Sequence, residues 1–232
     1  MYKNKTFLAV IPARGGSKRL PRKNILDLDG KPLIAYSIEA GFESNYIDEV
    51  VVSSDDHEIL EIAQGYKAQS LKRPEALASD TATTVDAIKH TIENFDKYDY
   101  IVLLQPTSPL RDASHINEAI ELLNEKDADA IVSVCEMEHS PLWANTLDDS
   151  LSLEGFLRDE VLNQRSQDLE TYYRLNGAIY ICKVEKFLEE KSFLLSKNTF
   201  AYVMSRECSI DIDEKIDFQI AKVLKKGLHE NI

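Results

Sequence analysis

The chain has 232 residues, of which 44% are hydrophobic and 29% charged, with only eight glycines and seven prolines. This composition is typical of a folded globular protein and excludes a disordered, collagen-like or low-complexity chain. No apolar run approaches the roughly 18 residues of a membrane span, so we expect no contact with a membrane. Cys135, Cys182 and Cys208 are an odd number without CxxC spacing, which disfavours a disulfide framework or a zinc site and favours the cytoplasm.

The charge is unevenly distributed along the chain. The net charge of −13 disfavours a nucleic-acid binder. Residues 1–31 nevertheless carry eight basic and two acidic residues, a net +6, while the rest of the chain carries a net −19. Five of the basic residues lie between positions 14 and 23, in a segment that contains glycine and proline. This crowding favours a local anion-binding site over a solvated basic face.

Strands and helices are predicted to alternate along the chain. A helix beginning near Pro32 has Leu33, Ile34, Ile38 and Phe42 on its apolar face. Short apolar runs predict strands, and apolar residues at helical spacing predict helices. In chain order we expect a strand at 8–11, a helix from 32, a strand at 50–52, a helix capped by Asp55 or Asp56, a strand at 69–71, a helix at 85–95, a strand at 100–104, a helix around 116–123 and a strand at 130–134.

The pattern breaks after Cys135. Residues 136–175 are polar and aromatic with weak periodicity, which suggests a small inserted subdomain or an oligomer arm. A strand at 178–182, a helix near 184–191 and a strand at 201–204 follow. A final helix begins near Glu214, with Ile216, Ile220, Ala221 and Leu224 as its apolar face. The alternation predicts an α/β fold with a mainly parallel sheet and helices on both faces, formed by residues 1–135 and 176–232.

Four polar clusters are expected to meet at one edge of this sheet. In open α/β sheets, ligands bind at the carboxyl ends of the strands. The clusters that follow predicted strands are Arg14–Asn24, Ser53–Asp56, Gln105–Arg111 and Asp211–Asp213.

The first cluster has the chemistry of a phosphate-binding loop. Its two glycines, Gly15 and Gly16, allow close approach of a ligand to the backbone N–H groups. Arg14, Lys18 and Lys23 can neutralise a triphosphate. The loop matches neither the Walker A motif nor GxGxxG, and an ordinary strand–helix turn with surface lysines remains the alternative.

The last cluster suggests a metal site. In an extended segment, Asp211 and Asp213 point to one side and Ile212 to the other, toward the core. Two carboxylates together with phosphate oxygens and water suit Mg²⁺. The alternatives are surface charge, or a cap by Asp213 on the last helix. The five histidines lack metal-ligand spacing, and no Ser/His/Asp or Cys/His catalytic arrangement is visible in the sequence.

Five segments together resemble the acylneuraminate cytidylyltransferases, or CMP-sialic acid synthetases. The similarity covers essentially the whole chain, and the segments occur in the family's order and spacing. They are Ile11–Lys18 with Lys23-Asn24, Arg73-Pro74 with Leu77–Thr81, Leu104–Arg111, Asn176–Tyr180 and Ser209–Asp213. The resemblance implies a three-layer Rossmann-like fold of the nucleotide-diphospho-sugar transferase type. Kdo cytidylyltransferases share that fold, but their N-terminal motif differs.

The resemblance implies a reaction in which the anomeric hydroxyl of a nonulosonic acid attacks the α-phosphate of CTP. CMP-nonulosonic acid forms and pyrophosphate leaves. Lys23, Arg14 and Asp211 would be the catalytic residues, and Asp211 and Asp213 would hold Mg²⁺. The nucleotide would be bound by Arg14, Gly15, Gly16, Ser17, Lys18, Lys23, Asn24, Arg73, Ala82 and Thr84.

The resemblance also implies a sugar site made by Gln105, Arg165, Arg174 and Tyr180. In the family, a partner subunit completes this pocket through the inserted subdomain, so we expect a homodimer in which 136–175 has that role. The chain departs from some sialic acid enzymes at Trp143 and Leu175, both on the sugar side. Legionaminic and pseudaminic acid are therefore as reasonable as N-acetylneuraminic acid.

Two other functions are compatible with parts of this pattern. A nucleotide-sugar glycosyltransferase also combines a Rossmann-like sheet with a D-x-D metal site, but it would place that motif in the middle of the chain. A nucleotide-binding module without catalytic activity would not need Lys23, Asp211 and Asp213 together, so their presence argues against it.

Overall fold

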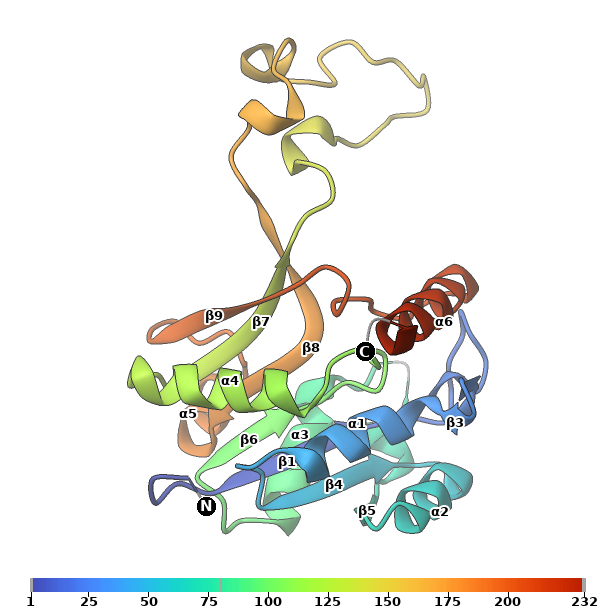
Figure 1. Ribbon diagram of the computed structural model, residues 1–232, viewed down its shortest axis with the longest axis vertical. Coiled ribbons are helices and arrows are strands. Elements are labelled where there is room, and N and C mark those ends of the chain that lie inside the picture. The colour runs from blue at the N-terminus through green and yellow to red at the C-terminus, as the bar shows by residue number, and fades with distance from the viewer. Residues whose placement is uncertain (1, 80, 231–232) are drawn as a thin grey trace.

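A seven-stranded sheet organises the protein. The computed structural model describes residues 2–79 and 81–230, so Asp80 of the recognised segment lies outside the described residues. The strand order across the sheet is β5-β4-β1-β6-β8-β7-β9 (Figure 1). The strands are β1 (Phe7–Pro12), β4 (Glu49–Ser54), β5 (Gln69–Lys72), β6 (Tyr100–Leu103), β7 (Ala130–Glu136), β8 (Tyr173–Lys183) and β9 (Thr199–Met204). A small hairpin, β2 (Asp27–Leu28) and β3 (Lys31–Pro32), lies between β1 and β4 and was not predicted from the sequence.

The sheet is mainly parallel, as predicted. β1 pairs in parallel with β4 and β6, β4 with β5, and β7 with β9. β8 runs antiparallel to both of its neighbours, β6 and β7. The reversal follows from the chain path: the segment after β7 returns directly into β8 without a crossover helix, and a direct return makes adjacent strands antiparallel.

Alternate residues of the central strands build two apolar layers. Phe7, Ala9 and Ile11 of β1 face one side, and Leu8 and Val10 face the other. Helices α1 (Leu33–Glu43), α2 (His57–Gly65) and α4 (Ala113–Glu125) pack on the first side. Helices α3 (Thr84–Asn94) and α5 (Val184–Glu190) pack on the second. The three-layer α/β fold is thus confirmed, and no helix in the described part of the chain is long and apolar enough to span a membrane.

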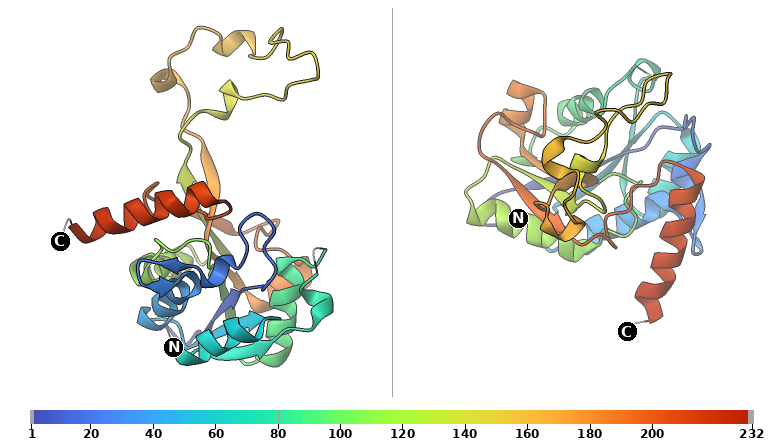
Figure 2. Two further views of the ribbon diagram at one scale, coloured as in Figure 1. Left: turned by 90° about the vertical axis from the view of Figure 1, so that its right-hand side faces the viewer. Right: turned by 90° about the horizontal axis from the view of Figure 1, so that it is seen from above.

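The last helix, α6 (Lys215–Glu230), joins a third and smaller core. Its Ala221 is buried with Leu28, Leu33, Tyr36 and Ile212. Figure 2 shows the far end of α6 extending away from the body of the protein.

The predicted apolar face of α6 is partly wrong, since Ile216 and Ile220 are 57% and 41% exposed. Ala221 of the predicted face is buried, as expected, and Phe218, which was not predicted, packs beside it. Phe42, in the last turn of α1, is also half exposed rather than buried.

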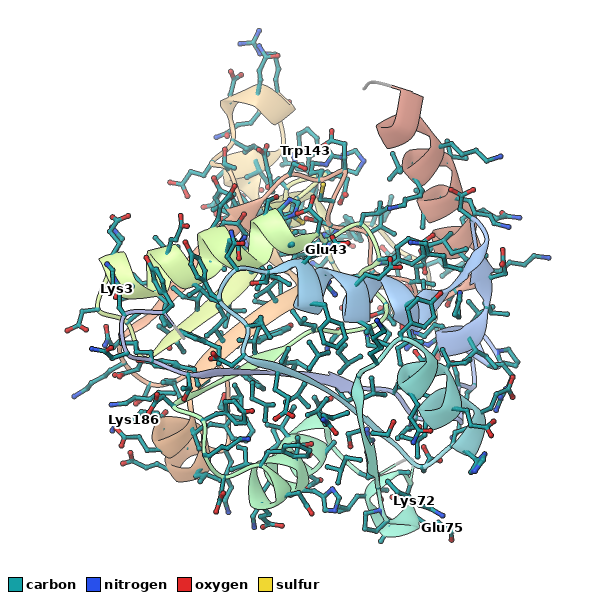
Figure 3. The ribbon with its side chains drawn as sticks, turned by 60° about the horizontal axis from the view of Figure 1, so that its bottom comes forward. Lys3, Glu43, Lys72, Glu75, Trp143 and Lys186 are labelled. Atoms are coloured by element: carbon teal, nitrogen blue, oxygen red, sulfur yellow. The ribbon has the colours of Figure 1, made fainter. Side chains whose placement is uncertain are left out.

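The segment between β7 and β8 projects beyond the sheet. The two strands stay paired as far as Glu136 and Tyr173, so residues 137–172, here called the arm, lie outside the sheet. Figures 1 and 2 show the arm standing away from the helices. It contains three 3₁₀ turns, at Pro141–Trp143, Asp159–Val161 and Ser166–Asp168. Trp143 lies in the first of them and is partly buried (Figure 3).

A buried polar network shapes the sheet beside the arm. Val132 pairs with Tyr180 and Val134 with Leu175, so residues 176–179 of β8 face the single residue Ser133. Asn176 fills this irregularity. Its carbonyl accepts hydrogen bonds from the Ser133 hydroxyl (2.6 Å) and the Ala178 N–H (3.2 Å), and its amide donates to the Ser209 hydroxyl (2.9 Å). The network thereby ties β7, β8 and the segment after β9 together.

We predict that Asn176→Ala lowers the free energy of unfolding by about 2–4 kcal/mol, because it orphans several buried polar groups at once. Chemical denaturation measures this. Asn163→Ala is the control, since Asn163 is exposed on the arm and should change stability by less than about 0.5 kcal/mol. Equal stability of the two variants would contradict a structural role for the network.

Candidate active site

A cleft of about 400 Å³ opens at the carboxyl edge of the sheet, where β1 and β6 end. Three of the four predicted clusters line it, which confirms that the topology brings them together. The fourth, Ser53–Asp56, is not among its lining residues. The cleft is lined by Pro12, Arg14, Lys23, Asn24, Arg73, Ala82, Thr83, Thr84, Ala87, Gln105, Pro106, Thr107, Asp211 and Asp213.

A second hollow of about 380 Å³ continues from this cleft over the basic loop. The two share Arg14, Lys23, Asn24 and Asp213, so they form one continuous depression. The rest of the second hollow is lined by Gly16, Ser17, Lys18 and Arg19. The predicted phosphate-binding residues therefore occupy one end of the depression, while Arg73, Ala82 and Thr84 occupy the other.

Lys23 connects the basic loop to the carboxylate pair. Its ammonium lies 2.6 Å from the Ile212 carbonyl oxygen and 3.0 Å from Asp213 Oδ1. Arg19 also pairs with Asp213, at 3.1 Å. Ile212 is fully buried between the two aspartates, as the alternation predicts. The Asp213 carboxylate therefore faces the basic loop, and at the start of α6 the Asp217 carboxylate accepts the N–H groups of Asp213 and Glu214.

Two aspartates of the Ser53–Asp56 segment bind the basic loop Arg14–Asn24 and hold it in place. Asp55 accepts a hydrogen bond from the Gly15 N–H at 3.0 Å, and Asp56 pairs with Arg22. Of the two aspartates predicted as helix caps, Asp56 caps α2 and Asp55 holds the loop. A side chain at Gly15 would approach Asp56 Oδ2 to 2.5 Å, so glycine is required there. The Gly15 N–H thus donates its hydrogen bond to Asp55 within the protein, whereas Gly16 lines the second hollow.

Arg73 and Asn24 are held in place by buried contacts. The Arg73 guanidinium donates to the Ser53 hydroxyl (3.2 Å) and the Ser53 carbonyl (2.6 Å). Burial lowers the pKa of Arg73, and the nearby Asp55 carboxylate opposes this. The Asn24 amide donates to the Arg14 carbonyl at 3.0 Å, which closes the base of the loop. Both side chains are thus fixed before any ligand arrives.

Asp211 lines the cleft and is exposed to it. Partial burial of its carboxylate raises its pKa, against a hydrogen bond from Thr107. The Gly177 backbone passes directly beneath. An added Cβ there would lie 2.9 Å from Gln105 Oε1 and 3.4 Å from Asp211 Oδ2. Gly177 has φ +76°, so both its conformation and its space favour glycine.

Of the four predicted sugar-site residues, only Gln105 lines the cleft. Tyr180 packs against Phe193 in the core, close enough for Asp211 to affect its pKa, which is raised mainly by burial. Arg174 lies beside Glu138 at 3.8 Å, at the base of the arm. Arg165 is on the arm, where it pairs with Asp168 at 2.8 Å. Within one chain, Arg165 and Arg174 are thus not among the residues that line the cleft, and Tyr180 lies near Asp211 without lining it.

Several cleft residues were not singled out from the sequence, among them Thr83 and Thr107. Thr83 is the N-cap of α3, in a capping box with Asp86, and it stands between the two predicted residues Ala82 and Thr84. Thr107 lies in the recognised Gln105–Arg111 segment, and its carbonyl accepts the Ile212 N–H at 2.8 Å. The T-x-x-D spacing of a capping box was the available signal for Thr83.

We predict that Gly177→Ala destabilises the protein by about 1–3 kcal/mol more than Gly155→Ala does. Both positions have positive φ, so both variants carry the strain of a left-handed alanine. Only position 177 adds close contacts, because nothing lies within 4 Å of a Cβ at Gly155. Equal losses in denaturant titrations would show that strain alone matters and that the contact with Gln105 and Asp211 does not.

Comparison with known proteins identifies the family of this chain. The profile of the family described as cytidylyltransferase matches residues 8–228. The chain is 39% identical over 221 residues to the N-acylneuraminate cytidylyltransferase of Escherichia coli O18:K1:H7, covering 95% of this chain and 52% of that protein. It is 37% identical to the pseudaminic acid cytidylyltransferase of Campylobacter jejuni, covering 97% and 98% of the two chains. For the CMP-N,N′-diacetyllegionaminic acid synthase of Legionella pneumophila, the identity is 38% and the coverage 94% and 95%.

The chain thus spans about half the length of the N-acylneuraminate enzymes it matches and nearly all of the other two. A solved structure of CMP-2-keto-3-deoxy-manno-octonic acid synthetase complexed with CTP has the same fold, with a TM-score of 0.73 at 18% identity over 96% of this chain and 99% of that one. The solved structure of the 4-diphosphocytidyl-2C-methyl-D-erythritol synthase of Anaerococcus prevotii has a TM-score of 0.66 at 13% sequence identity. The match covers 96% of this chain and 99% of that one. With the profile match and three relatives above 30% identity, the chain belongs to the cytidylyltransferase family.

Proposed function

We propose that this protein transfers the cytidylyl group of CTP to a nonulosonic acid, forming a CMP-nonulosonic acid and pyrophosphate. The observation that carries the proposal is the contact of Lys23 with the Ile212–Asp213 segment, which places a basic phosphate-binding loop beside two carboxylates in one cleft. The family membership and the names of the relatives support the choice of CTP and of a nine-carbon acid.

The charges along the depression favour one orientation of the nucleotide. The triphosphate would occupy the basic end, where Arg14, Lys18 and Lys23 neutralise its charge and Gly16 and Ser17 offer backbone and hydroxyl donors. The cytosine would lie at the other end, beside Arg73, Ala82 and Thr84, and Asn24 would lie near the ribose. This direction leaves the α-phosphate near Lys23 and the carboxylate pair.

The chain contributes mostly position and charge to the reaction. The sugar hydroxyl attacks the α-phosphorus, an oxygen–phosphorus bond forms, and the bond to the β-phosphate oxygen breaks. Lys23 would stabilise the charge that develops on the α-phosphoryl oxygens and on the leaving pyrophosphate. The fixed contacts of Asn24 and Arg73 would reduce the cost of ordering the site when CTP binds.

The carboxylate pair fits a divalent cation. Both carboxylates line the cleft, and the neighbouring cations Lys23 and Arg19 pair with Asp213. Asp211 and Asp213 supply only oxygen donors, which suits Mg²⁺. When bound, this ion would neutralise phosphate charge and act as a Lewis acid. The described residues hold no group of three or more acidic, His or Cys ligands, so phosphates and water would complete the shell.

We further propose that the protein acts as a homodimer in the cytoplasm. Arg165 stands on the arm with a 73% exposed side chain, away from the cleft of its own chain. The arm corresponds to the predicted inserted subdomain, residues 136–175. In a dimer it would reach the cleft of the second copy and present Arg165 to the sugar carboxylate. Exposed Leu147, Leu151, Leu153 and Leu162 on the arm support an interface there. The unpaired cysteines suit a reducing compartment.

Pyrophosphate release from CTP and Mg²⁺ is the test, with N-acetylneuraminic, legionaminic, pseudaminic and Kdo acids as acceptors. We expect turnover with one or more nine-carbon acids and little with the eight-carbon Kdo. Lys23→Ala and Asp211→Asn should each lower kcat/KM by about a hundredfold or more, since each removes a charge from the transition state. Lys126→Ala, at an exposed position in the turn after α4, is the charge control and should leave turnover unchanged. CTP binding without pyrophosphate release across the panel would refute the proposal.

Subunit mixing tests the role of the arm. Lys23→Ala and Arg165→Ala chains should each be impaired alone. Refolded together, they should regain roughly a quarter of wild-type activity, because half of the dimers are mixed and each mixed dimer has one intact site. No recovery on mixing, with dimers confirmed by sedimentation, would mean that Arg165 does not act on the partner's cleft.

A further inference from the structure

Two buried polar side chains lie directly behind the part of the cleft wall that Gln105 forms. Ser37 of α1 is fully buried and Arg111 is 1% exposed, and neither is among the residues that line the cleft. The Ser37 hydroxyl donates to the Gln105 carbonyl at 3.1 Å and accepts a hydrogen bond from the Arg111 guanidinium at 2.7 Å. A chain of hydrogen bonds therefore runs from Arg111 through Ser37 to a residue of the cleft.

Arg111 is a costly residue to bury in this position. Its Nε and Nη1 groups have no hydrogen-bond partner among the described residues, and burying a charge without full pairing is unfavourable. Burial lowers the pKa of Arg111 to about 10, and Asp112 opposes this, so the guanidinium stays protonated at neutral pH. A charged donor polarises the hydroxyl that it contacts. The Ser37 O–H is thereby a stronger donor to the Gln105 carbonyl.

The backbone around Gln105 is held from two directions. From the α1 side, its carbonyl accepts the Ser37 hydroxyl, and within the loop it also accepts the Ser108 N–H at 3.3 Å. From the other side, the Thr107 carbonyl accepts the Ile212 N–H at 2.8 Å. The first residues of the loop after β6 are thus fixed between α1 and the segment that carries the two carboxylates. Ser37 supplies the contact from the α1 side.

The Gln105 side chain lies beside Asp211. A Cβ at Gly177 would be 2.9 Å from Gln105 Oε1 and 3.4 Å from Asp211 Oδ2, so both side chains flank the same point of β8. A group held by the Gln105 amide would therefore lie next to one of the carboxylates assigned to the divalent cation. In the proposed reaction the acceptor hydroxyl must reach the α-phosphate in this region, so the position of Gln105 suits an acceptor contact.

We propose that Ser37 is a positioning residue which, with Arg111 behind it, holds Gln105 in the orientation that binds the nonulosonic acid. This inference rests on the proposed transfer reaction. Without the Ser37 hydroxyl, the Gln105 carbonyl loses its anchor on α1, and a displaced acceptor contact lowers the rate steeply. The cytosine end of the depression is held separately, because Arg73 is bound to Ser53. The acceptor side should therefore be affected more than the CTP side.

The kinetic test compares Ser37→Ala with Ser44→Ala. Ser44 is also a buried serine of the α1 region, at the C-cap of the helix, and its hydroxyl donates to Asn117 of α4 at 2.8 Å. At saturating CTP and Mg²⁺, Ser37→Ala should lower kcat/KM for the acceptor about tenfold or more, while the Kd for CTP measured by calorimetry changes less than about twofold. Ser44→Ala should leave both quantities within about twofold of wild type. Equal acceptor kcat/KM in the two variants would overturn the proposal.

A double-mutant cycle with Gln105→Ala tests whether Ser37 acts through Gln105. In the Gln105→Ala background, Ser37→Ala should lower acceptor kcat/KM by less than about twofold. Losses that multiply independently would contradict the proposal. If Ser37→Ala does not fold, the double variant Ser37→Ala/Arg111→Met takes its place, because removing a buried donor together with its acceptor is better tolerated than removing one partner. It should show the same loss on the acceptor side.

A spectroscopic measurement scores the inference without any turnover. The side-chain amide of Gln105 is assigned in NMR spectra of the ligand-free protein by its loss in Gln105→Glu. Its resonances should shift in Ser37→Ala and stay in place in Ser44→Ala. Wild-type protein that releases no pyrophosphate with any acid would refute the transfer reaction, and the amide signal would still decide the role of Ser37. An unchanged amide signal in Ser37→Ala would overturn that role even in an active enzyme.

Discussion

The contact of the N-terminal loop with the Asp211–Asp213 segment is the constraint on which the active-site cleft depends. Ile212 is buried in the third core, and its N–H and carbonyl are bound to Thr107 and Lys23. This one residue therefore fixes the loops after β1 and β6 against the end of the chain. Because Ile212 points into the core, the extended backbone directs the side chains of Asp211 and Asp213 to the opposite side, toward the cleft.

The electrostatics of the cleft follow from the same arrangement. A basic loop on an acidic protein would be attracted to many carboxylates, and the structure assigns specific ones to it. Asp55 accepts a hydrogen bond from the Gly15 N–H and Asp56 pairs with Arg22. Asp213 forms ion pairs with Lys23 and Arg19. These pairings keep the cationic side chains ordered, and an incoming triphosphate would compete with Asp213 for Lys23 and Arg19. A divalent cation on the carboxylate pair would ease that competition, because it gives Asp213 another partner.

The antiparallel strand β8 links the arm, the cleft and the segment after β9. Its first half extends toward the arm, its bend at Gly177 lies against Gln105 and Asp211, and Asn176 in the same bend donates a hydrogen bond to Ser209. The arm and the cleft are thus connected through a few residues of one strand and the segment that it contacts.

The sequence by itself determined the α/β alternation, the sheet edge where the cleft lies, and the alternation of Asp211, Ile212 and Asp213. These features depend on local periodicity and on the rule that ligands bind at the carboxyl ends of strands, so neighbouring residues suffice to predict them. The recognised segments added the family, which the comparisons confirmed.

Only the tertiary structure decided which polar residues meet across long distances in the chain. The direction of β8, the commitment of the Gly15 N–H to Asp55, and the exposure of Ile216 on α6 each depend on packing between distant segments. The same holds for the hydrogen bond between Tyr202 of β9 and Glu118 of α4, which lie 84 residues apart. A local pattern constrains which side a residue faces, but the partner on that side is set by the fold.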